Sequence, residues 1–203
     1  MKMIRTSSSE WREHLVFLGA LVRNPRSVGA IVPSSVQLAK KIAEVVTPGS
    51  RVIELGPGTG VVTRELLART GSRGKILAVD TDRAFVEGIR RAWPEIDCAC
   101  ASAETLPILA AERGWTHVDH IVSGLPFAVL PADTTRLIID GVDRLLRQGG
   151  TFTTFQYAHA FRFHAAAAFR RQMSARLACE PTSQFVVRNV PPALVLTWHR
   201  LAH

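Results

Sequence analysis

Hydrophobic and polar residues alternate along this chain in blocks that predict strands and helices in turn. The short apolar runs RVIEL, KILAVD and IDCAC suit buried strands, and each precedes a stretch with apolar residues at helical spacing. The same succession continues through HVDHIVSG and GTFTTFQYA. Alternation of this kind predicts an α/β doubly wound sheet of mainly parallel strands with helices between them.

The boundaries follow from where each pattern begins and ends. The predicted strands are residues 51–55, 75–80, 96–100, 117–124 and 150–158, and the predicted helices are 61–69, 83–92, 104–112, 132–147 and 160–173. Two later apolar runs, residues 183–190 and 193–200, lie close together in the sequence. We expect them to pair antiparallel at one edge of the sheet.

The first 48 residues form an N-terminal segment ahead of a domain that spans residues 49–203. Apolar and aromatic residues recur at helical spacing near its start, with an arginine at the end of the pattern, which predicts an amphipathic helix. The residues concerned are Trp11, Leu15, Phe17, Leu18 and Arg23. Pro25 ends this helix, and a second helix is expected over residues 35–46. Two roles stay open for the first helix: packing on the protein's own sheet, or lying on a membrane surface.

Composition narrows the setting in which such a chain works. Its 203 residues are 47% hydrophobic, enough for a sizeable core. Three cysteines without CxxC spacing argue against a disulfide framework and favour a reducing compartment. No apolar run reaches the roughly 18 residues of a membrane span, and residues 15–22 lack a signal-peptide cleavage pattern. We therefore expect a cytosolic protein.

The net charge of +8 is unevenly distributed along the chain. Residues 1–50 carry a net charge of +4, residues 51–158 a net charge of −1, and residues 159–203 a net charge of +5. Because the basic surplus lies outside the middle of the chain, it predicts an anionic partner, either nucleic acid or a membrane, for the terminal segments. A generally basic, solvated surface is the alternative.

A glycine-rich turn follows the first predicted strand. In VIELGPGTG an acidic residue, Glu54, ends the strand, and Gly56, Gly58 and Gly60 follow at alternate positions before a helix. Glycines are needed where the backbone turns sharply or a ligand lies on the main chain. A second acid, Asp80, ends the next strand, where dinucleotide enzymes bind ribose hydroxyls. GPGTG does not contain the dinucleotide fingerprint GxGxxG, however.

An acidic strand end followed by GxGxG resembles the class I methyltransferases that bind S-adenosylmethionine. The resemblance implies that Glu54 orders the methionine end of this cofactor, that the three glycines pack beneath it, and that Asp80 holds its ribose. It also implies adenine contacts from Thr81, Ser102 and Ala103, although many relatives have Asp where Ser102 stands. A tight strand-to-helix turn without a ligand is the structural alternative.

The segment VSGLPF ends the fourth predicted strand, where amino-methylating members of this fold present the acceptor nitrogen. Adenine and glutamine methylases carry an Asn/Asp-Pro-Pro-Tyr type of sequence there, whereas this chain has Ser123 in place of the amide or acid. An aliphatic amine is therefore a better acceptor than a planar base. The carbonyls of Gly124 and Leu125, held rigid by Pro126, would accept its hydrogen bonds, and Phe127 would supply the aromatic contact.

The chain as a whole resembles the soluble bacterial phospholipid N-methyltransferases, which are related to the ribosomal RNA adenine dimethyltransferases. The resemblance rests on FLGALVRNPRSVGAIVPSS, VIELGPGTGVVTRELL, VSGLPF and FVVRNVPPA. It implies a seven-stranded, Rossmann-like sheet with an N-terminal amphipathic extension. It also implies successive methyl transfers to the amine of phosphatidylethanolamine, giving phosphatidylcholine, by an enzyme peripheral on the cytoplasmic face of the inner membrane.

This resemblance makes the N-terminal helix a membrane-docking element, because an interfacial helix with Trp, Phe and Arg binds anionic bilayers. Tyr157, at the end of the fifth strand, could contact a methylammonium by cation–π attraction, or serve in the core. Arg188 is the candidate clamp for the lipid phosphate, with a surface salt bridge as the alternative. We expect an anionic phospholipid membrane as partner, and neither nucleic acid nor metal.

Two other functions compete with this interpretation. A ribosomal RNA adenine dimethyltransferase shares the glycine motif and the positive charge, but usually carries Asn-Leu-Pro-Tyr where VSGLP stands. A non-catalytic lipid-binding module on the same fold would have no reason to retain Glu54, Asp80 and all three glycines. His117 and His120 most simply mark the entry to the fourth strand rather than a metal site, since alternate residues of a strand face opposite ways.

Overall fold

A single seven-stranded sheet organises the structure, a computed structural model that describes residues 31–187, 189 and 191–201. The strands are β1 (Arg51–Leu55), β2 (Lys75–Asp80), β3 (Asp97–Cys100), β4 (Val118–Ser123), β5 (Leu146–Tyr157), β6 (Thr182–Val186) and β7 (Ala193–His199). The helices are α2 (Ile31–Ala43), α3 (Val61–Thr70), α4 (Arg83–Ala92), the 3₁₀ turn η1 (Ala103–Thr105), α5 (Leu106–Glu112), α6 (Ala132–Leu145) and α7 (His164–Leu177).

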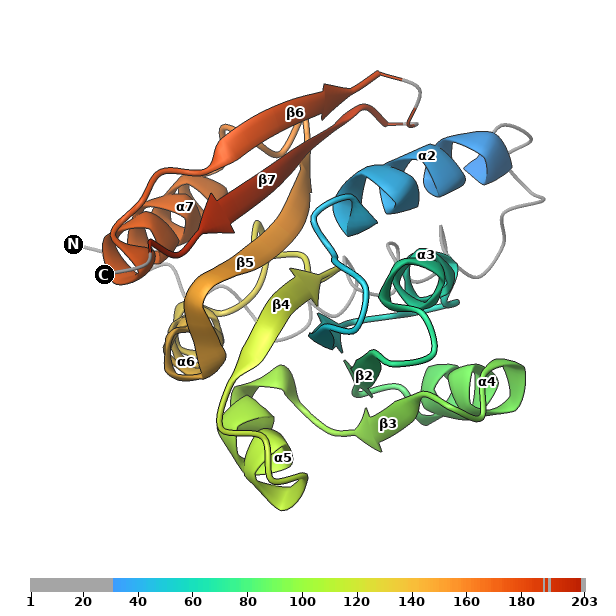
Figure 1. Cartoon of the computed structure of the whole chain (residues 1–203). Helices are drawn as coiled ribbons and strands as arrows, with labels where there is room; N and C mark the ends of the chain where they lie inside the picture. The colour runs from blue at the N-terminus through green and yellow to red at the C-terminus, as the bar shows by residue number, and fades with distance from the viewer. Residues whose placement is uncertain (1–30, 188, 190, 202–203) are drawn as a thin grey trace.

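The strand order is β3-β2-β1-β4-β5-β7-β6, and Figure 1 shows the sheet with its helices around it. The pairs from β3 to β5 are parallel, whereas β7 runs antiparallel to both β5 and β6. The expected antiparallel pair at one edge is therefore confirmed. Because β1 to β5 are parallel, their carboxyl ends lie at one edge of the sheet, where doubly wound folds bind ligands.

Helices cover both faces of the sheet. One hydrophobic core lies under α5, α6 and α7 and includes Phe127, Phe152, Phe169 and Trp198. The other lies under α2, α3 and α4 and is built from smaller aliphatic residues such as Ile42. This two-layered burial explains why the central strands read as nearly continuous apolar runs rather than as alternating ones.

Element boundaries differ from the sequence prediction mainly where a pattern has no sharp stop. Helix α7 begins at His164 rather than at residue 160, because residues 157–163 first make two turns: the Ala160 N–H donates to the Tyr157 carbonyl and the Phe163 N–H to the Ala160 carbonyl. Strand β6 ends at Val186 rather than at residue 190, and β5 begins directly after α6. The helix expected over 104–112 is a 3₁₀ turn followed by α5, which has Pro107 in its first turn.

The N-terminal prediction is only partly within the described residues. Helix α2 begins and ends a few residues earlier than the expected 35–46, and it packs on α3 through Leu38 and Ile42 in the second core. The predicted helix over residues 10–23 lies outside the described residues, so the boundary at residue 48 stays a prediction. None of the helices in the described part of the chain is long and apolar enough to cross a bilayer.

Candidate functional site: the carboxyl ends of strands β1, β2 and β4

The glycine turn between β1 and α3 is held against the neighbouring strand. Gly56, Gly58 and Gly60 have φ angles of 72°, 54° and 84°, a region that side chains disfavour. The Gly56 N–H donates to the Val79 carbonyl at 2.9 Å. A Cβ atom on Gly60 would lie 2.5 Å from the Trp93 ring and 2.7 Å from Ile89. The glycines therefore let the turn lie close against β2 and α4.

Glu54 lies inside the protein, one residue before the end of β1, with only 1% of its surface exposed. Its Oε2 accepts a hydrogen bond from the Thr63 hydroxyl at 2.7 Å. Burial raises the pKa of Glu54 to about 8; the Thr63 hydrogen bond opposes this shift and the charge of Asp80 adds to it. A buried carboxyl of this kind gains from a cationic partner, such as the ammonium of an amino acid. Thr63 was not among the residues predicted from the sequence.

Asp80 connects the end of β2 to the glycine turn. Its Oδ2 accepts from the Gly58 N–H at 3.3 Å, and its Oδ1 from the Asp82 N–H at 2.9 Å. Burial raises the pKa of Asp80, against the lowering effect of these two hydrogen bonds. Asp80 thus lies beside the glycine turn, and its expected contact with a ribose stays a prediction.

The residues expected at the adenine lie next to Asp80, after β2 and β3. The Ala101 N–H donates to the Asp80 carbonyl at 2.9 Å, which places the following Ser102 and Ala103 beside it. The Ser102 hydroxyl caps η1 by accepting from the Glu104 N–H, and it lies 3.1 Å from the Glu104 carboxylate. Thr81 is exposed, whereas Ala103 is buried. The structure therefore brings these three residues to one side of the turn.

The VSGLPF segment lies directly against the glycine turn. The Gly124 N–H donates to the Leu55 carbonyl at 2.8 Å, and a Cβ atom on Gly124 would lie 2.7 Å from the Gly56 carbonyl oxygen. Leu125 is equally close, since its Cδ2 would be 3.1 Å from a Cβ atom on Gly56. Glycine is thus required on both sides of this contact, which brings the two predicted halves of the site together.

Hydrogen bonds hold the backbone of this segment in place. Ser123 is buried, its hydroxyl accepts from the Leu125 N–H at 3.2 Å, and its carbonyl accepts from the Thr154 hydroxyl at 2.9 Å. The Leu125 carbonyl, one of the two expected amine acceptors, already receives the Phe127 N–H at 3.0 Å. It therefore has one remaining lone pair to offer. Pro126 is partly exposed beside it.

Phe127 lies elsewhere than the sequence analysis expected. Only 2% of it is exposed, and its ring stacks on Phe169 of α7 with centroids 3.9 Å apart. It also meets the edge of Phe152. The aromatic ring after Pro126 is consequently part of the hydrophobic core, so its expected contact with an acceptor is corrected. The ring turns inward because there its whole apolar surface is removed from water.

Tyr157 is partly buried at the end of β5, on the face covered by α2. Its ring lies edge-on to Phe155 and parallel to His159, with centroids 5.4 Å and 5.8 Å away. Burial raises the pKa of its hydroxyl, so it stays a neutral hydrogen-bond donor at physiological pH. Both interpretations made from the sequence, a core role and a contact with a methylammonium, are compatible with this position.

The remaining predicted residues lie outside the described part of the chain. These are the phosphate clamp Arg188 and the membrane-docking residues Trp11, Leu15, Phe17, Leu18 and Arg23. Among the described residues there is no group of three or more His, Cys, Asp or Glu side chains that could hold a metal ion.

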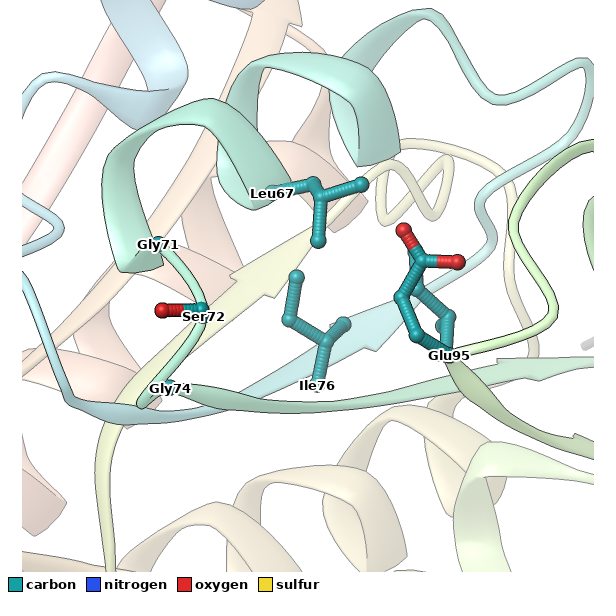
Figure 2. A pocket seen from close by; sticks show the side chains of 7 residues that line it. Leu67, Gly71, Ser72, Gly74, Ile76 and Glu95 are labelled. Carbon is teal, nitrogen blue, oxygen red and sulfur yellow. The ribbon is translucent and has the colours of Figure 1, made fainter.

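A hollow elsewhere on the molecule is not part of this site. Figure 2 shows it between the end of α3 and the starts of β2 and β3, lined by residues that include Leu67, Ile76 and Glu95. Its position at the amino ends of the strands puts it at the opposite edge of the sheet from the glycine turn. It lacks the acids and glycines described above.

Comparisons with known proteins agree with this geometry. Residues 52–150 match the family described as methyltransferase domain. A solved structure of 1,6-didemethyltoxoflavin-N1-methyltransferase from Burkholderia thailandensis, with bound 1,6-didemethyltoxoflavin and S-adenosylhomocysteine, has a TM-score of 0.68 and 19% identity. That similarity covers 100% of this chain and 94% of the other. Fibrillarin from Aeropyrum pernix, solved with natively bound S-adenosyl-L-methionine, has a TM-score of 0.62 at 14% identity over 79% of this chain and 73% of its own.

Curated relatives fall into two groups. The ornithine lipid N-methyltransferase of Singulisphaera acidiphila is 26% identical over 190 residues, which are 90% of this chain and 93% of that protein. A probable ribosomal RNA small subunit methyltransferase A of Thermococcus gammatolerans is 29% identical over 110 residues, which are 53% of this chain and 36% of that protein. Residues 52–150 are therefore similar to methyltransferase domains, and the chain has the Rossmann-like fold of the class I methyltransferases.

Proposed function

We propose that the chain transfers methyl groups from S-adenosylmethionine to the head-group amine of phosphatidylethanolamine, giving the mono-, di- and trimethylated lipids in succession. The observation that carries this proposal is the close contact between the two turns, in which Gly124 lies directly on the carbonyls of Leu55 and Gly56. An amine at Gly124 and Leu125 would face a methyl donor held above the glycine turn. Positioning of this kind is the main requirement of a methyl transfer.

The cofactor would lie along the residues that end β1, β2 and β3. Glu54 and the glycines would hold its methionine end, Asp80 its ribose, and Thr81, Ser102 and Ala103 its adenine. The buried Glu54 carboxyl, with its pKa near 8, would ionise when the cofactor ammonium arrives. Because the Glu54 carboxyl is buried beside a hydroxyl but no cation among the described residues, it would favour a ligand that brings a positive charge.

The acceptor amine must lose a proton before it reacts. A primary ammonium has a pKa near 10 by analogy with lysine, so partial desolvation of the site must favour the neutral amine. The Gly124 and Leu125 carbonyls would orient this amine by accepting hydrogen bonds from its N–H groups. The nitrogen lone pair then forms a bond to the methyl carbon while the carbon–sulfur bond breaks, and water takes the proton. S-Adenosylhomocysteine leaves, and the methylated nitrogen can repeat the reaction.

A lipid substrate is favoured over RNA by the extent of the similarity. The lipid-methylating relative matches 90% of this chain, whereas the ribosomal RNA methyltransferase matches 53%. The chain also has large exposed hydrophobic residues at the carboxyl edge of the sheet, namely Phe163, Phe185 and Val187. We propose accordingly that the protein acts as a peripheral protein on the cytoplasmic face of an anionic membrane.

The amine of ornithine lipid is the second candidate acceptor, because the relative that matches 90% of this chain is an ornithine lipid N-methyltransferase. Both lipids present a primary amine on a flexible chain, so the turn at Gly124 suits either. The test is incubation of the protein with radiolabelled S-adenosylmethionine and vesicles that contain one lipid or the other. Label in phosphatidylethanolamine supports the proposal, label in ornithine lipid alone supports the second candidate, and label in neither contradicts both.

A further inference from the structure

Arg170, on α7, is a partly buried arginine without a carboxylate partner among the described residues. Arg170 differs in this from four other arginines whose side chains are less than half exposed. Each of those four forms an ion pair with an aspartate: Arg113, Arg147, Arg176 and Arg200. Arg170 instead donates through Nη1 to the Gln156 Oε1 at 2.6 Å and to the Phe161 carbonyl at 2.9 Å. Its guanidinium lies over the Phe161 ring, 3.8 Å from the centroid. Within the part of the chain that the structure describes, its positive charge therefore meets only neutral acceptors.

Gln156 adds a second donor that the fold leaves unused. Only 5% of this residue is exposed, and its Nε2 has no hydrogen-bond partner within the described structure. A buried amide donor left unpaired costs free energy, and such groups call for an explanation. Because the Gln156 Oε1 faces Arg170, the amide nitrogen and the guanidinium belong to one cluster. The cluster offers donors and a positive charge, and its described acceptors are already in use.

The cluster lies next to the acceptor turn. Ser123 of β4 pairs with Thr154 of β5, and Gln156 follows two residues later on the same face of the strand. Two strand residues span roughly 7 Å, so Gln156 lies about that far beyond the level of Ser123, at the edge of the sheet where the turn after β4 begins. The neighbour of Arg170, Phe169, stacks on Phe127 of the same turn. Two elements thus bring the donors close to the turn that follows β4.

We infer that Arg170 and Gln156 form an oxyanion-binding subsite that holds the anionic group of the amine-bearing head group. This inference rests on the proposed function, which it extends by naming the residues that recognise the part of the substrate that does not react. The phosphate of phosphatidylethanolamine and the carboxylate of ornithine lipid both lie a few bonds from the amine, so both fit the same chemistry. A guanidinium with a neighbouring N–H donor suits either oxyanion.

The electrostatic surroundings of the Arg170 guanidinium also agree with this assignment. Burial and the charge of Arg171 both lower the pKa of Arg170, so an anion would be the natural stabilising partner. The alternative is structural: Arg170 would only tie the loop at Phe161 to the end of β5. A decisive experiment must separate these two roles.

The separating variant is Gln156→Glu, which places a carboxylate against Arg170 without removing any contact of the guanidinium. A purely structural role predicts an equally stable protein with unchanged kinetics. An oxyanion subsite predicts that the internal carboxylate competes with the lipid, so that KM for the lipid rises at least tenfold while kcat changes little. Arg170→Gln should raise KM by a similar factor, the usual worth of one charge-assisted hydrogen bond. Arg171→Gln, next to it on the exposed side of α7, is the matched control and should keep the wild-type KM.

Two separate measurements identify the lipid that binds at Arg170 and test the subsite independently of the methylation reaction. Each variant is assayed on vesicles of phosphatidylethanolamine and of ornithine lipid, and the lipid whose KM depends on Arg170 is the one held there. Each is also titrated calorimetrically, with S-adenosylhomocysteine present, against glycerophosphoethanolamine and against ethanolamine. Binding of glycerophosphoethanolamine that weakens tenfold in Arg170→Gln supports the subsite even if neither lipid is methylated. Equal binding by all folded variants, or no binding by any, overturns it, whatever the lipid assay shows.

Discussion

At the residue scale, burial moves the pKa of Glu54 far from its value in water. Its pKa of about 8 lies above the ordinary value of 4.5, so between these pH values the folded protein holds a proton that the unfolded chain has released. Stability of the cofactor-free protein should therefore fall as pH rises from about 4.5 to 8 and stay level above, because the unfolded state binds fewer protons in that window.

Glu54→Gln removes this ionisation and keeps the shape of the side chain. We expect the variant to become more stable than the wild type as pH rises through that window, by up to a few kcal/mol at pH 8. Denaturant unfolding at a series of pH values measures the difference. The same variant should lose affinity for S-adenosylmethionine, because a neutral amide does not pair with the cofactor ammonium. A stability difference independent of pH would show that Glu54 is ionised throughout.

Gly60 provides a second residue-scale prediction, because two costs act on one position. Alanine there must adopt a φ of 84°, and its Cβ must also displace the Trp93 ring. The left-handed conformation costs about 1–2 kcal/mol, and overpacking adds about 1–3 kcal/mol. Gly60→Ala should thus destabilise the protein and weaken cofactor binding.

Gly49→Ala is the matched control for that substitution. Gly49 has a φ of 78°, yet nothing lies within 4 Å of the position its Cβ would take. This variant should show the conformational cost alone and keep full cofactor affinity, measured by calorimetry. Equal effects at both positions would mean that contact with Trp93 has no influence on the shape of the turn.

At the element scale, the turn after β4 depends on α7 for its position. Phe127 stacks on Phe169 and is buried with Phe152, so its ring anchors the turn to the helix. Phe127→Ala should cost about 3–5 kcal/mol of unfolding free energy through the cavity it leaves. Phe127→Leu should recover part of that loss. A ring that faced a substrate instead would leave stability unchanged, so thermal unfolding distinguishes the two positions.

The elements that the sequence predicts well are those whose pattern is local. The acid at the end of β1, the glycines and the acid at the end of β2 follow one another within 27 residues, and the structure places them together. The direction of Phe127 is a tertiary outcome, because a single aromatic residue in a turn has no periodicity to reveal its face. The contact between Gln156 of β5 and Arg170 of α7 joins residues 14 apart in the sequence, and only the packing of the two elements brings it about.

Boundaries are harder to predict for the same reason. The stretch AHAFRFHAAAAFRR has helical spacing from end to end, so nothing in it marks His164 as the first helical residue. The start is fixed by contacts from other parts of the chain. The Ala158 N–H pairs with the Pro192 carbonyl, and this bond keeps the backbone extended up to the turn at residue 160.

At the scale of the whole molecule, charge and exposed apolar surface occur together near one edge of the sheet. Because β6 runs parallel to β5, its end lies at the same edge as the glycine turn, with Phe185 57% exposed and Val187 beside it. Phe163 lies in the connection that leaves β5 at this edge. Residues 159–203 carry a net charge of +5, which suits an anionic surface.

We therefore predict that Phe163→Ser and Phe185→Ser together weaken binding to vesicles of phosphatidylethanolamine and phosphatidylglycerol by at least tenfold. Removing two aromatic rings from a lipid contact loses at least about 1.5 kcal/mol of apolar burial. The measurement is co-sedimentation at two salt concentrations, since the basic residues add an attraction that salt screens.

Leu201→Ser is the control that makes this result specific. Leu201 is 56% exposed, much like Phe185, but it follows β7 at the opposite edge of the sheet, where the Arg200 N–H pairs with the Gly150 carbonyl. Since all three residues are exposed, none of the substitutions should change the unfolding free energy by more than about 0.5 kcal/mol. Loss of vesicle binding in the double variant alone would orient the acceptor turn toward the bilayer. An equal loss in Leu201→Ser would contradict that orientation, because no single flat membrane can contact both edges of the sheet.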